Sequence, residues 1–426
     1  MTGPTPLRVG MAVYGDITHD SRVRREAEAL ARAGHEVSVA CLPAVDGVPW
    51  SPDGLRIVPL QPHRSPALPG TRRTGGAGRL PRAVDLGRWM AGYVANVLAW
   101  GRQVTTAVTG VDVWHLHDLP ALLAVARCVP RTVPLVYDSH ELYVDTGLPA
   151  RLPAPLRALV AAGEARLVRR VHTLITVNDA LEEVLRGRYR PRRTAVVYNS
   201  PPRSAPYTGP DRLRGATGIP PAAPIVVHHG QLAPARGLWR LVDAMLEPGL
   251  ERAHLVLIGY GPLRGPLEDA AALRRFGGRI HVLDAVPPDD VVAWISTGDV
   301  EAIACPDATL NLRLSTPNKL FECIAAGVPP VVSDLPGMRA VVLERGGPLG
   351  ALCDPGSPAT IARAIRGVLE LPAPARAALR QRCLDAAARR WNWENQASHL
   401  LSAYDRLAWE RSAATRAVPT PGQRPT

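Results

Sequence analysis

Short apolar runs alternate with helix-period segments along most of the chain, and this alternation constrains the fold more than any other feature. In the first half the runs cover residues 7–14, 36–42, 111–117, 133–138, 173–177 and 194–198, and in the second half residues 224–229, 254–259, 280–283, 300–304 and 330–333. Several are almost continuous in Val, Ile and Leu, as is typical of parallel strands buried on both faces. The alternation therefore predicts an α/β protein whose parallel sheets are covered by helices on both sides.

A stretch rich in proline, glycine and serine interrupts this alternation near the middle of the chain. It reads SPPRSAPYTGPDRLRGATGIPPAAP over residues 200–224, a composition typical of a linker. The chain has 426 residues, which is enough for two domains. We therefore expect two doubly wound, Rossmann-like domains facing one another across a cleft, with ligands beyond the carboxyl ends of their strands. The expected limits are 1–205 and 206–385, followed by a helical segment at 386–411 and a disordered tail at 412–426.

Charge and composition narrow the classes of partner. The net charge of +12 attracts anions without choosing among phosphorylated ligands, nucleic acid and acidic lipids. The spread of the charge and the lack of basic–aromatic interleaving argue against nucleic acid.

The six cysteines form no CxxC pair, so neither a zinc site nor a disulfide framework is predicted. The chain begins almost at once with a strand, and its apolar runs fall short of the roughly 20 residues of a membrane span. We expect a cytoplasmic protein.

Two segments leave open a peripheral contact with an anionic membrane, such as the inner face of the plasma membrane. Residues 151–170 mix arginine with apolar residues at helical spacing, and residues 89–100 form an apolar patch with tryptophan at both ends. Either segment could rest on an anionic bilayer near a lipid-linked acceptor. Ordinary packing of an amphipathic helix is the simpler interpretation of each.

Polar side chains end two neighbouring apolar runs of the first half. The motif HLHD occupies residues 115–118, and YDSHE occupies residues 137–141. Burying such groups is costly unless they are well bonded or face a cleft. These strand ends therefore predict the mouth of a ligand cleft. Of the two histidines in HLHD, we interpret His115 as structural and His117, nearer the loop, as functional.

The loop after the first run is another candidate site. Gly15 opens this loop, and Asp20 or Ser21 can cap the helix that follows. A helix N-terminus beside a glycine can bind an anion or a hydroxyl group. The loop is not GxGxxG, which disfavours dinucleotide binding. An ordinary strand–turn–helix corner is an equally good interpretation.

The second half opens with a strand that runs into Gly230 and Gln231, and Arg236 stands just before the next helix. An arginine at that position can hold a phosphate with its bidentate guanidinium. A merely solvated arginine is the alternative, because all basic residues of the chain except one are arginine. The position of the loop at a strand's carboxyl end favours phosphate binding.

The only lysine of the chain, Lys319, stands in the segment STPNKLFECIAAG at residues 315–327. A single lysine among so many arginines indicates a place where a compact ammonium group is needed. Ser315 or Thr316 could cap the helix. Lys319 and Glu322 share a helix face, so the pair could bind a nucleoside diphosphate, with the lysine on phosphate and the glutamate on ribose. An ordinary salt bridge between them is the alternative.

These motifs, in this order, closely resemble retaining glycosyltransferases of family 4, which have the GT-B fold. The matching pieces are HDSRVRREAEALARAGHEV, HLHD, YDSHEL, VVYNSP, GQLAPARG, LIGYGP, PNKLFECIAAGVPPVVSD and WNWENQ, and they span nearly the whole chain before the tail. The resemblance implies transfer of a sugar from a nucleotide diphosphate sugar to a glycan, lipid-linked or small-molecule acceptor, with no metal or other cofactor required. It also implies that the helix around Trp391 and Trp393 crosses back onto the first domain.

The resemblance implies roles for individual residues. Arg236 and Lys319 match the basic pair that holds the donor diphosphate, Glu322 matches the carboxylate on the ribose, and His117 matches the histidine that lines the sugar site. The expected catalytic residues are His117, Arg236 and Lys319; the expected donor-binding residues are Gly15, Gly230, Gln231, Arg236, Gly259, Gly261, Ser315, Asn318, Lys319, Leu320 and Glu322; and the expected acceptor-side residues are Asp20, Arg22, Asp118, His140 and Glu141.

The chain departs from the family pattern at two positions. Gln231 stands where the family often has arginine, and Leu314 stands where it usually has a second glutamate. The sequence therefore leaves open the donor sugar and its nucleotide, whether UDP, GDP, ADP or TDP. Two other functions also stay open: a nucleotide-sugar-binding pseudoenzyme or scaffold of a polysaccharide assembly complex, and a GT-B nucleotide-sugar epimerase.

Overall fold

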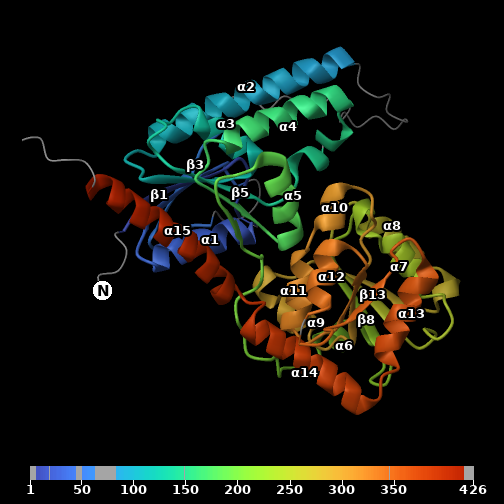
Figure 1. Cartoon of the computed structure of the whole chain (residues 1–426). Helices are drawn as coiled ribbons and strands as arrows, with labels where there is room; N and C mark the ends of the chain where they lie inside the picture. Colours follow the sequence, from blue (N-terminus) through green and yellow to red (C-terminus); the bar gives the residue numbers. More distant parts are fainter. Residues whose placement is uncertain are drawn as a thin grey trace, which may run out of the picture. The chain divides into compact units, whose positions relative to one another are not determined.

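A computed structural model describes residues 6–18, 20–44, 50–62, 83–147, 149–344 and 346–416 of the chain (Figure 1). The chain divides into two compact units. Unit 1 contains the described residues up to Val177, then Glu182–Val197 and the residues from Ala397 onward, whereas unit 2 contains Asn178–Leu181 and Tyr198–Gln396. The domain limits of 205 and 385 expected from the sequence lie near these boundaries and stay predictions.

Unit 1 is built on a seven-stranded sheet in the order β3-β2-β1-β4-β5-β6-β7, with every pair parallel. Its strands are β1 (Arg8–Val13), β2 (Glu36–Cys41), β3 (Leu55–Pro59), β4 (Val113–His117), β5 (Leu135–Ser139), β6 (Thr173–Thr176) and β7 (Thr194–Val196). Its helices are α1 (Ser21–Arg32), α2 (Ala83–Ala107), α3 (Asp118–Ala126), α4 (Ala154–Val168) and most of α5 (Asp179–Tyr189). Figure 1 shows α2, α3 and α4 on one face of this sheet and α1 on the other.

Unit 2 is built on a six-stranded parallel sheet in the order β10-β9-β8-β11-β12-β13. Its strands are β8 (Ile225–Gln231), β9 (His254–Tyr260), β10 (Ile280–Leu283), β11 (Val300–Ile303), β12 (Pro330–Ser333) and β13 (Ala351–Cys353). Its helices are α6 (Arg212–Thr217), α7 (Leu238–Ala244), α8 (Arg264–Ala271), α9 (Val291–Ile295), α10 (Leu310–Leu314), α11 (Asn318–Ala325), α12 (Pro336–Val342), α13 (Pro358–Leu369) and α14 (Ala373–Arg389). The two parallel sheets with their helices confirm the expected α/β class.

The apolar runs predict the central strands because those strands are buried on both faces. All residues of β4, β5 and β6 are buried in unit 1, as are all residues of β11 and β12 in unit 2. The sequence analysis missed β3 and β13, which lie at sheet edges. β3 is only half-buried or exposed along its length and β13 has three residues, so neither carries a sustained apolar run.

The helical segment near the carboxyl end is broken once, close to Asn392. Helix α14 ends at Arg389, and α15 (Trp393–Arg416) begins after an interval of three residues. The side chain of Asn392 donates to the carbonyl groups of Ala387 and Ala388 and accepts from the backbone N–H of Asn395, so one residue bonds the end of one helix and the start of the next. Helix α15 continues to Arg416, which corrects the expected disorder for residues 412–416; residues 417–426 lie outside the described part.

In the described part of the chain, the helices are too short or too polar to cross a bilayer.

Candidate functional site

The carboxyl end of β8 and the start of α11 meet in unit 2. β8 runs two residues beyond its expected end, because Gly230 pairs with Gly259 and Gln231 with Tyr260 of β9. α11 begins at Asn318, directly after Pro317 in the N-cap position. The strand therefore delivers its last residues to a helix N-terminus, the arrangement that the sequence predicts for ligand binding in a doubly wound sheet.

Lys319 is a buried cation whose partner lies on β8. Its side chain is 8% exposed, and its Nζ lies 2.8 Å from Nε2 of His228. Nδ1 of His228 lies 2.7 Å from the carbonyl oxygen of Ala302. Burial lowers the pKa of Lys319, and the charge of Glu301 opposes this effect. An ammonium group held in this way keeps hydrogen-bond donors for an anion, because it has three N–H bonds.

Glu322, one turn further along α11, is held by the other histidine of β8. Its Oε2 lies 2.9 Å from Nε2 of His229, and Nδ1 of His229 lies 3.1 Å from Oε1 of Glu301. Glu301 is fully buried, whereas the side chain of Glu322 is 21% exposed. Burial alone would lower the pKa of His229, but Glu301 and Glu322 outweigh it and raise the pKa to about 9. Glu322 thus presents a carboxylate at the surface over a buried ion network.

Arg236 lies in a single 3₁₀ turn, Pro234–Arg236, between β8 and α7. Its Nη2 donates to Oε1 of Gln231 over 3.2 Å. The turn ends at Gly237, whose φ is 71° and whose added Cβ would lie 1.9 Å from the carbonyl oxygen of Ala304. Only glycine suits that position. Gln231, one of the two departures from the family pattern, therefore orients the arginine instead of adding a second cation.

The glycines of this region serve close packing between β8 and β9. A Cβ at Gly259 would lie 1.8 Å from the carbonyl oxygen of Gly230, and one at Gly261 would lie 2.4 Å from that of Leu232. A Cβ at Gly230 would lie 3.6 Å from Nζ of Lys319, which places the lysine directly beside this strand end. The structure thus gives Gly259 and Gly261 a packing reason, and their donor-binding role stays a prediction.

The other expected donor-side residues of unit 2 differ in position. Ser315 donates to the carbonyl of Leu312 over 2.9 Å and closes α10. The expected cap of α11 by Ser315 or Thr316 is wrong, because Pro317 is the N-cap residue and no side chain caps the helix. Asn318 is exposed and accepts from Asn199 over 3.0 Å. Leu320 is fully buried and belongs to the core. The side chain of Leu320 therefore offers no polar contact to a ligand.

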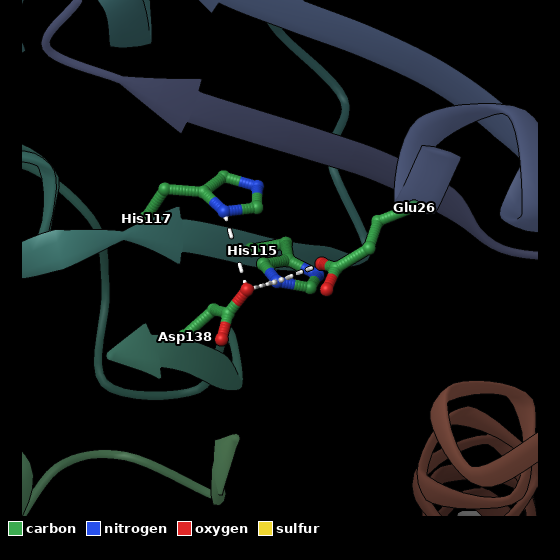
Figure 2. A group of neighbouring side chains, drawn as sticks. All are labelled: Glu26, His115, His117 and Asp138. Atoms are coloured by element: carbon green, nitrogen blue, oxygen red, sulfur yellow. Dashed lines mark ion pairs between the residues drawn. The ribbon is translucent and has the colours of Figure 1, made fainter. Parts of the chain in front are cut away.

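Unit 1 carries a second, fully buried cluster at the ends of β4 and β5, joined by α1 (Figure 2). His115 and His117 stack with ring centroids 4.6 Å apart. Nε2 of His115 lies 3.2 Å from Oε2 of Glu26, and Nδ1 of His117 lies 3.4 Å from Oδ2 of Asp138. Figure 2 shows both carboxylates directed toward the histidine rings. The expected structural role of His115 agrees with its other bond, to the hydroxyl of Tyr404 over 2.9 Å.

Arg22 of α1 supplies the positive charge of this cluster. Its Nε and Nη2 each lie 2.8 Å from an oxygen of Asp138, its Nη2 lies 3.1 Å from Glu26, and its Nη1 donates to the carbonyl of Val197. Arg22 is 3% exposed. Burial would raise the pKa of Asp138, but Arg22 and His140 hold it well below its usual range. The structure thus engages Arg22 internally, and its acceptor-side role stays a prediction.

Glu26, His115, His117 and Asp138 also offer ligand atoms within 4.8 Å of one another, as a metal site would. Arg22 already forms ion pairs with both carboxylates, so a divalent cation there would be held beside a buried guanidinium group. Like charges so close in a buried place are strongly unfavourable. The donor set therefore fits a charge-balanced ion network better than it fits a metal ion.

Three cluster residues have buried polar atoms without a hydrogen bond among the described residues. Those of Glu26 and His115 lie at ion-pair distance from Arg22 or from each other, which leaves His117. It is 1% exposed, and its Nε2 has no hydrogen-bond partner among the described residues. Burial and the neighbouring His115 lower the pKa of His117, against the effect of Asp138. A neutral, buried imidazole with one open nitrogen can accept or donate a single hydrogen bond. This geometry supports the expectation that His117 is functional.

The remaining expected residues of unit 1 surround this cluster. Asp118 adopts a φ of 59° and accepts from the backbone N–H of His140, and His140 lies 3.1 Å from both His117 and Asp138. Asp20 caps α1 by accepting from the N–H groups of Arg22 and Val23, as one of the two expected caps. The other two residues lie apart from these contacts. Glu141 accepts from Thr146, and a Cβ at Gly15 would make only an ordinary van der Waals contact, 3.9 Å from Cγ2 of Val13.

The position of His140 gives a testable pH dependence. Burial would lower its pKa, but Asp118 and Asp138 raise it to about 10. The folded chain therefore holds a proton that the unfolded chain loses near the unperturbed pKa of about 6.5. We expect the free energy of unfolding to fall as pH rises from about 6.5 to 10, by up to about 1.4 kcal/mol per pH unit from this residue.

Urea unfolding at a series of pH values would measure this slope. His140→Gln is the control, because glutamine keeps a polar side chain and cannot take up the proton. The part of the slope due to His140 should vanish in that variant, while the contribution of His229 remains. An identical slope in both proteins would contradict the assignment.

Sequence reasoning missed four groups that hold the candidate residues in place: Glu26, His228, His229 and Glu301. Glu26 lies on an apolar helix face one turn after Arg22, and Glu301 interrupts a buried strand. Buried charges are rare unless they are paired. A glutamate within an apolar stripe of the sequence was therefore the signal that could have revealed Glu26 and Glu301, although the sequence does not indicate which residues pair with them.

Family models match both halves of the chain. The "Glycosyl transferase 4-like domain" matches residues 19–200, and "Glycosyl transferases group 1" matches residues 223–371. A D-inositol 3-phosphate glycosyltransferase of Xylanimonas cellulosilytica is 28% identical over 434 residues, which cover 95% of this chain and 93% of that protein. A 2-deoxystreptamine glucosyltransferase of Streptomyces kanamyceticus is 28% identical over 281 residues, which cover 62% of this chain and 70% of that protein.

Solved structures share the fold. Sucrose-phosphate synthase of Thermosynechococcus elongatus is similar with a TM-score of 0.71 and 19% identity, over 95% of this chain and 100% of that chain. HepE of Anabaena, in complex with UDP and glucose, is similar with a TM-score of 0.64 and 16% identity, over 96% of this chain and 100% of that chain. At these identities the similarity establishes the fold alone.

Proposed function

The chain belongs to the family 4 glycosyltransferases, the glycosyl transferases of group 1, with a GT-B fold, and from this premise we propose that it transfers a sugar from a nucleoside diphosphate sugar with retention at the anomeric carbon. The observation that carries the proposal is the cation–carboxylate pair on α11, in which Lys319 and Glu322 are each held by a histidine of β8. A diphosphate on Lys319 and ribose hydroxyls on Glu322 fit this pair.

In the proposed reaction the nucleoside diphosphate leaves as an anion. Its developing charge needs donors that are already in place, and fixed donors in a site with little water stabilise such charge most strongly. Lys319, the N-terminal amides of α11 and Arg236 would supply them, so the proposal requires no metal ion. The leaving phosphate oxygen would take the proton of the acceptor hydroxyl as the new glycosidic bond forms on the same face.

We assign His117 to the sugar site, with its open Nε2 as the polar atom that meets a sugar hydroxyl. A neutral imidazole suits this task, since it forms one directional hydrogen bond without attracting the diphosphate. The acceptor is proposed only by class: a glycan, a lipid-linked sugar or a small polyhydroxylated molecule. Two relatives are named for D-inositol 3-phosphate and for 2-deoxystreptamine, which supports testing small polyols first in an acceptor screen.

Arg236→Ala tests the phosphate assignment without touching the core. We expect about 10- to 100-fold weaker binding of the nucleoside diphosphate, because a charge-assisted bidentate contact is lost. Isothermal titration calorimetry with UDP, GDP, ADP and TDP would measure this change. Arg240→Ala is the matched control, since Arg240 is an exposed arginine of the next helix. Equal affinities in Arg236→Ala and wild type would remove Arg236 from the site.

The same preparation separates the alternatives. Incubation with each sugar nucleotide and no acceptor, followed by NMR, would reveal an epimerase by conversion of the donor sugar. A pseudoenzyme or scaffold would bind the nucleotide and leave the donor intact with every acceptor. Release of free nucleotide only when an acceptor is present is the result expected from a transferase.

A further inference from the structure

The lysine and the glutamate of the cation–carboxylate pair on α11 are each held by one of two adjacent histidines on β8. His228 contacts Lys319, and His229 contacts Glu322. Both histidines are buried, at 0% and 4% exposure. Their ring partners on the other side also come from one strand, since Ala302 and Glu301 are neighbours in β11. Two successive residues of β8 therefore link the same helix to the same neighbouring strand.

The contacts of His228 fix its proton. Nδ1 faces the carbonyl oxygen of Ala302 over 2.7 Å, and a carbonyl only accepts, so Nδ1 carries the hydrogen. Nε2 then presents its lone pair to Nζ of Lys319 over 2.8 Å. A second ring proton would place an N–H group against the ammonium. In agreement, burial and the charge of Lys319 hold the pKa of His228 well below its usual range.

The contacts of His229 require the opposite state. Both ring nitrogens face carboxylate oxygens, at 3.1 Å for Glu301 and 2.9 Å for Glu322. A neutral imidazole would leave one of the two carboxylates facing a bare ring nitrogen, whereas an imidazolium bonds to Glu322 through Nε2 and forms an ion pair with Glu301 at Nδ1. The backbone N–H of His229 also donates to Glu301 over 3.2 Å. The fully buried Glu301 thus has its counter-charge on His229.

We propose that His228 and His229 are positioning residues of the donor site with opposite protonation states. The neutral ring of His228 directs the ammonium of Lys319, and the imidazolium of His229 holds the carboxylate of Glu322 and cancels the charge of Glu301. This inference rests on the proposed function, in which Lys319 meets the diphosphate and Glu322 the ribose. Without the proton on His229, the two carboxylates would face only the charge of Lys319. The site would then carry an excess negative charge, and an anionic nucleotide would bind more weakly.

His229→Gln removes the charge and keeps an N–H group that can reach Glu322. We expect about tenfold weaker binding of the nucleoside diphosphate that the wild-type chain binds best, as for the loss of a charge-assisted hydrogen bond. His281→Gln is the matched control, because His281 lies in the same sheet on β10 and its ring bonds to His254 instead of to a donor-site residue. We expect wild-type affinity for that variant.

The pH profile of nucleotide binding distinguishes a charge effect from a packing effect. His229 is faced by Glu301 from β11, by Glu322 from α11 and by His228 on its own strand. Arg236 acts on the neighbouring His228 and Lys319. In the wild type the association constant should fall as pH rises through about 9, where His229 loses its proton. His229→Gln should lack this step and retain any step that belongs to Lys319. The same profile in both proteins would overturn the assignment of charge to His229.

A double-mutant cycle tests the action of His228 through Lys319. His228→Leu should weaken nucleotide binding, and His228→Gln, whose Oε1 can accept from the ammonium, should restore much of it. In a Lys319→Ala background the His228→Leu change should cause no further loss, because the group that it positions is gone. Additive losses would mean that His228 acts on packing alone. Circular dichroism and the melting temperature of each variant would confirm that it is folded.

The wild-type chain and Lys319→Ala separate this inference from the proposed function. If the wild-type chain binds no nucleoside diphosphate, the proposed function is overturned, and the inference with it. Nucleotide binding by the wild type, its loss in Lys319→Ala and wild-type behaviour of both histidine variants would overturn the positioning roles alone.

Discussion

Lys319→Ala is expected to reduce kcat/KM for sugar transfer by about 100- to 1000-fold, the loss typical of removing a fixed donor from a developing negative charge. The structure supports this magnitude because the ammonium is already buried and oriented by His228 before a ligand arrives. A donor that needs no reorganisation stabilises the transition state more than a flexible surface cation does.

Steady-state kinetics with the donor found by nucleotide screening would measure this effect. Lys319→Arg is an informative second variant, since it keeps the charge but has a planar fork that differs in shape from the compact ammonium; we expect it to recover little activity. Arg339→Ala is the control, because Arg339 forms an exposed ion pair with Asp334. A kcat/KM of Lys319→Ala within a few fold of the wild-type value would contradict the assignment of Lys319 to the diphosphate.

Arg22→Leu is expected to destabilise unit 1 by about 3–5 kcal/mol, the loss typical of breaking a buried ion pair. The change leaves the carboxylates of Glu26 and Asp138 buried without their shared cation. Asp138 should then take up a proton more readily, since Arg22 is the largest of the influences that hold its pKa down.

Urea unfolding monitored by circular dichroism would give the change in the free energy of unfolding. Arg32→Ala is the matched control on the same helix. Arg32 pairs with Glu28 four residues away, but its side chain is 70% exposed, and such a pair contributes less than about 1 kcal/mol. Equal effects of the two substitutions would show that the buried cluster does not depend on Arg22 for its charge balance.

The sequence by itself determined the architecture and the most informative single residue. Continuous apolar runs predict the central strands because strands buried on both faces admit few polar residues. The single lysine indicates a functional position. In a chain whose other basic residues are all arginine, a retained lysine indicates a need for a compact ammonium group. His117 also stands out, since a polar residue that ends a buried strand must be bonded or face a ligand.

Only the tertiary structure decided which groups hold these residues in place. Lys319 and His228 are 91 residues apart, and Arg22 and Asp138 are 116 apart, so their spacing in the sequence carries no information about the contact. The register of the sheets decides that His228 and His229 lie where α11 begins. Burial lowers the pKa of both histidines, so the atoms that their ring nitrogens face assign a neutral ring to the first and a charged ring to the second.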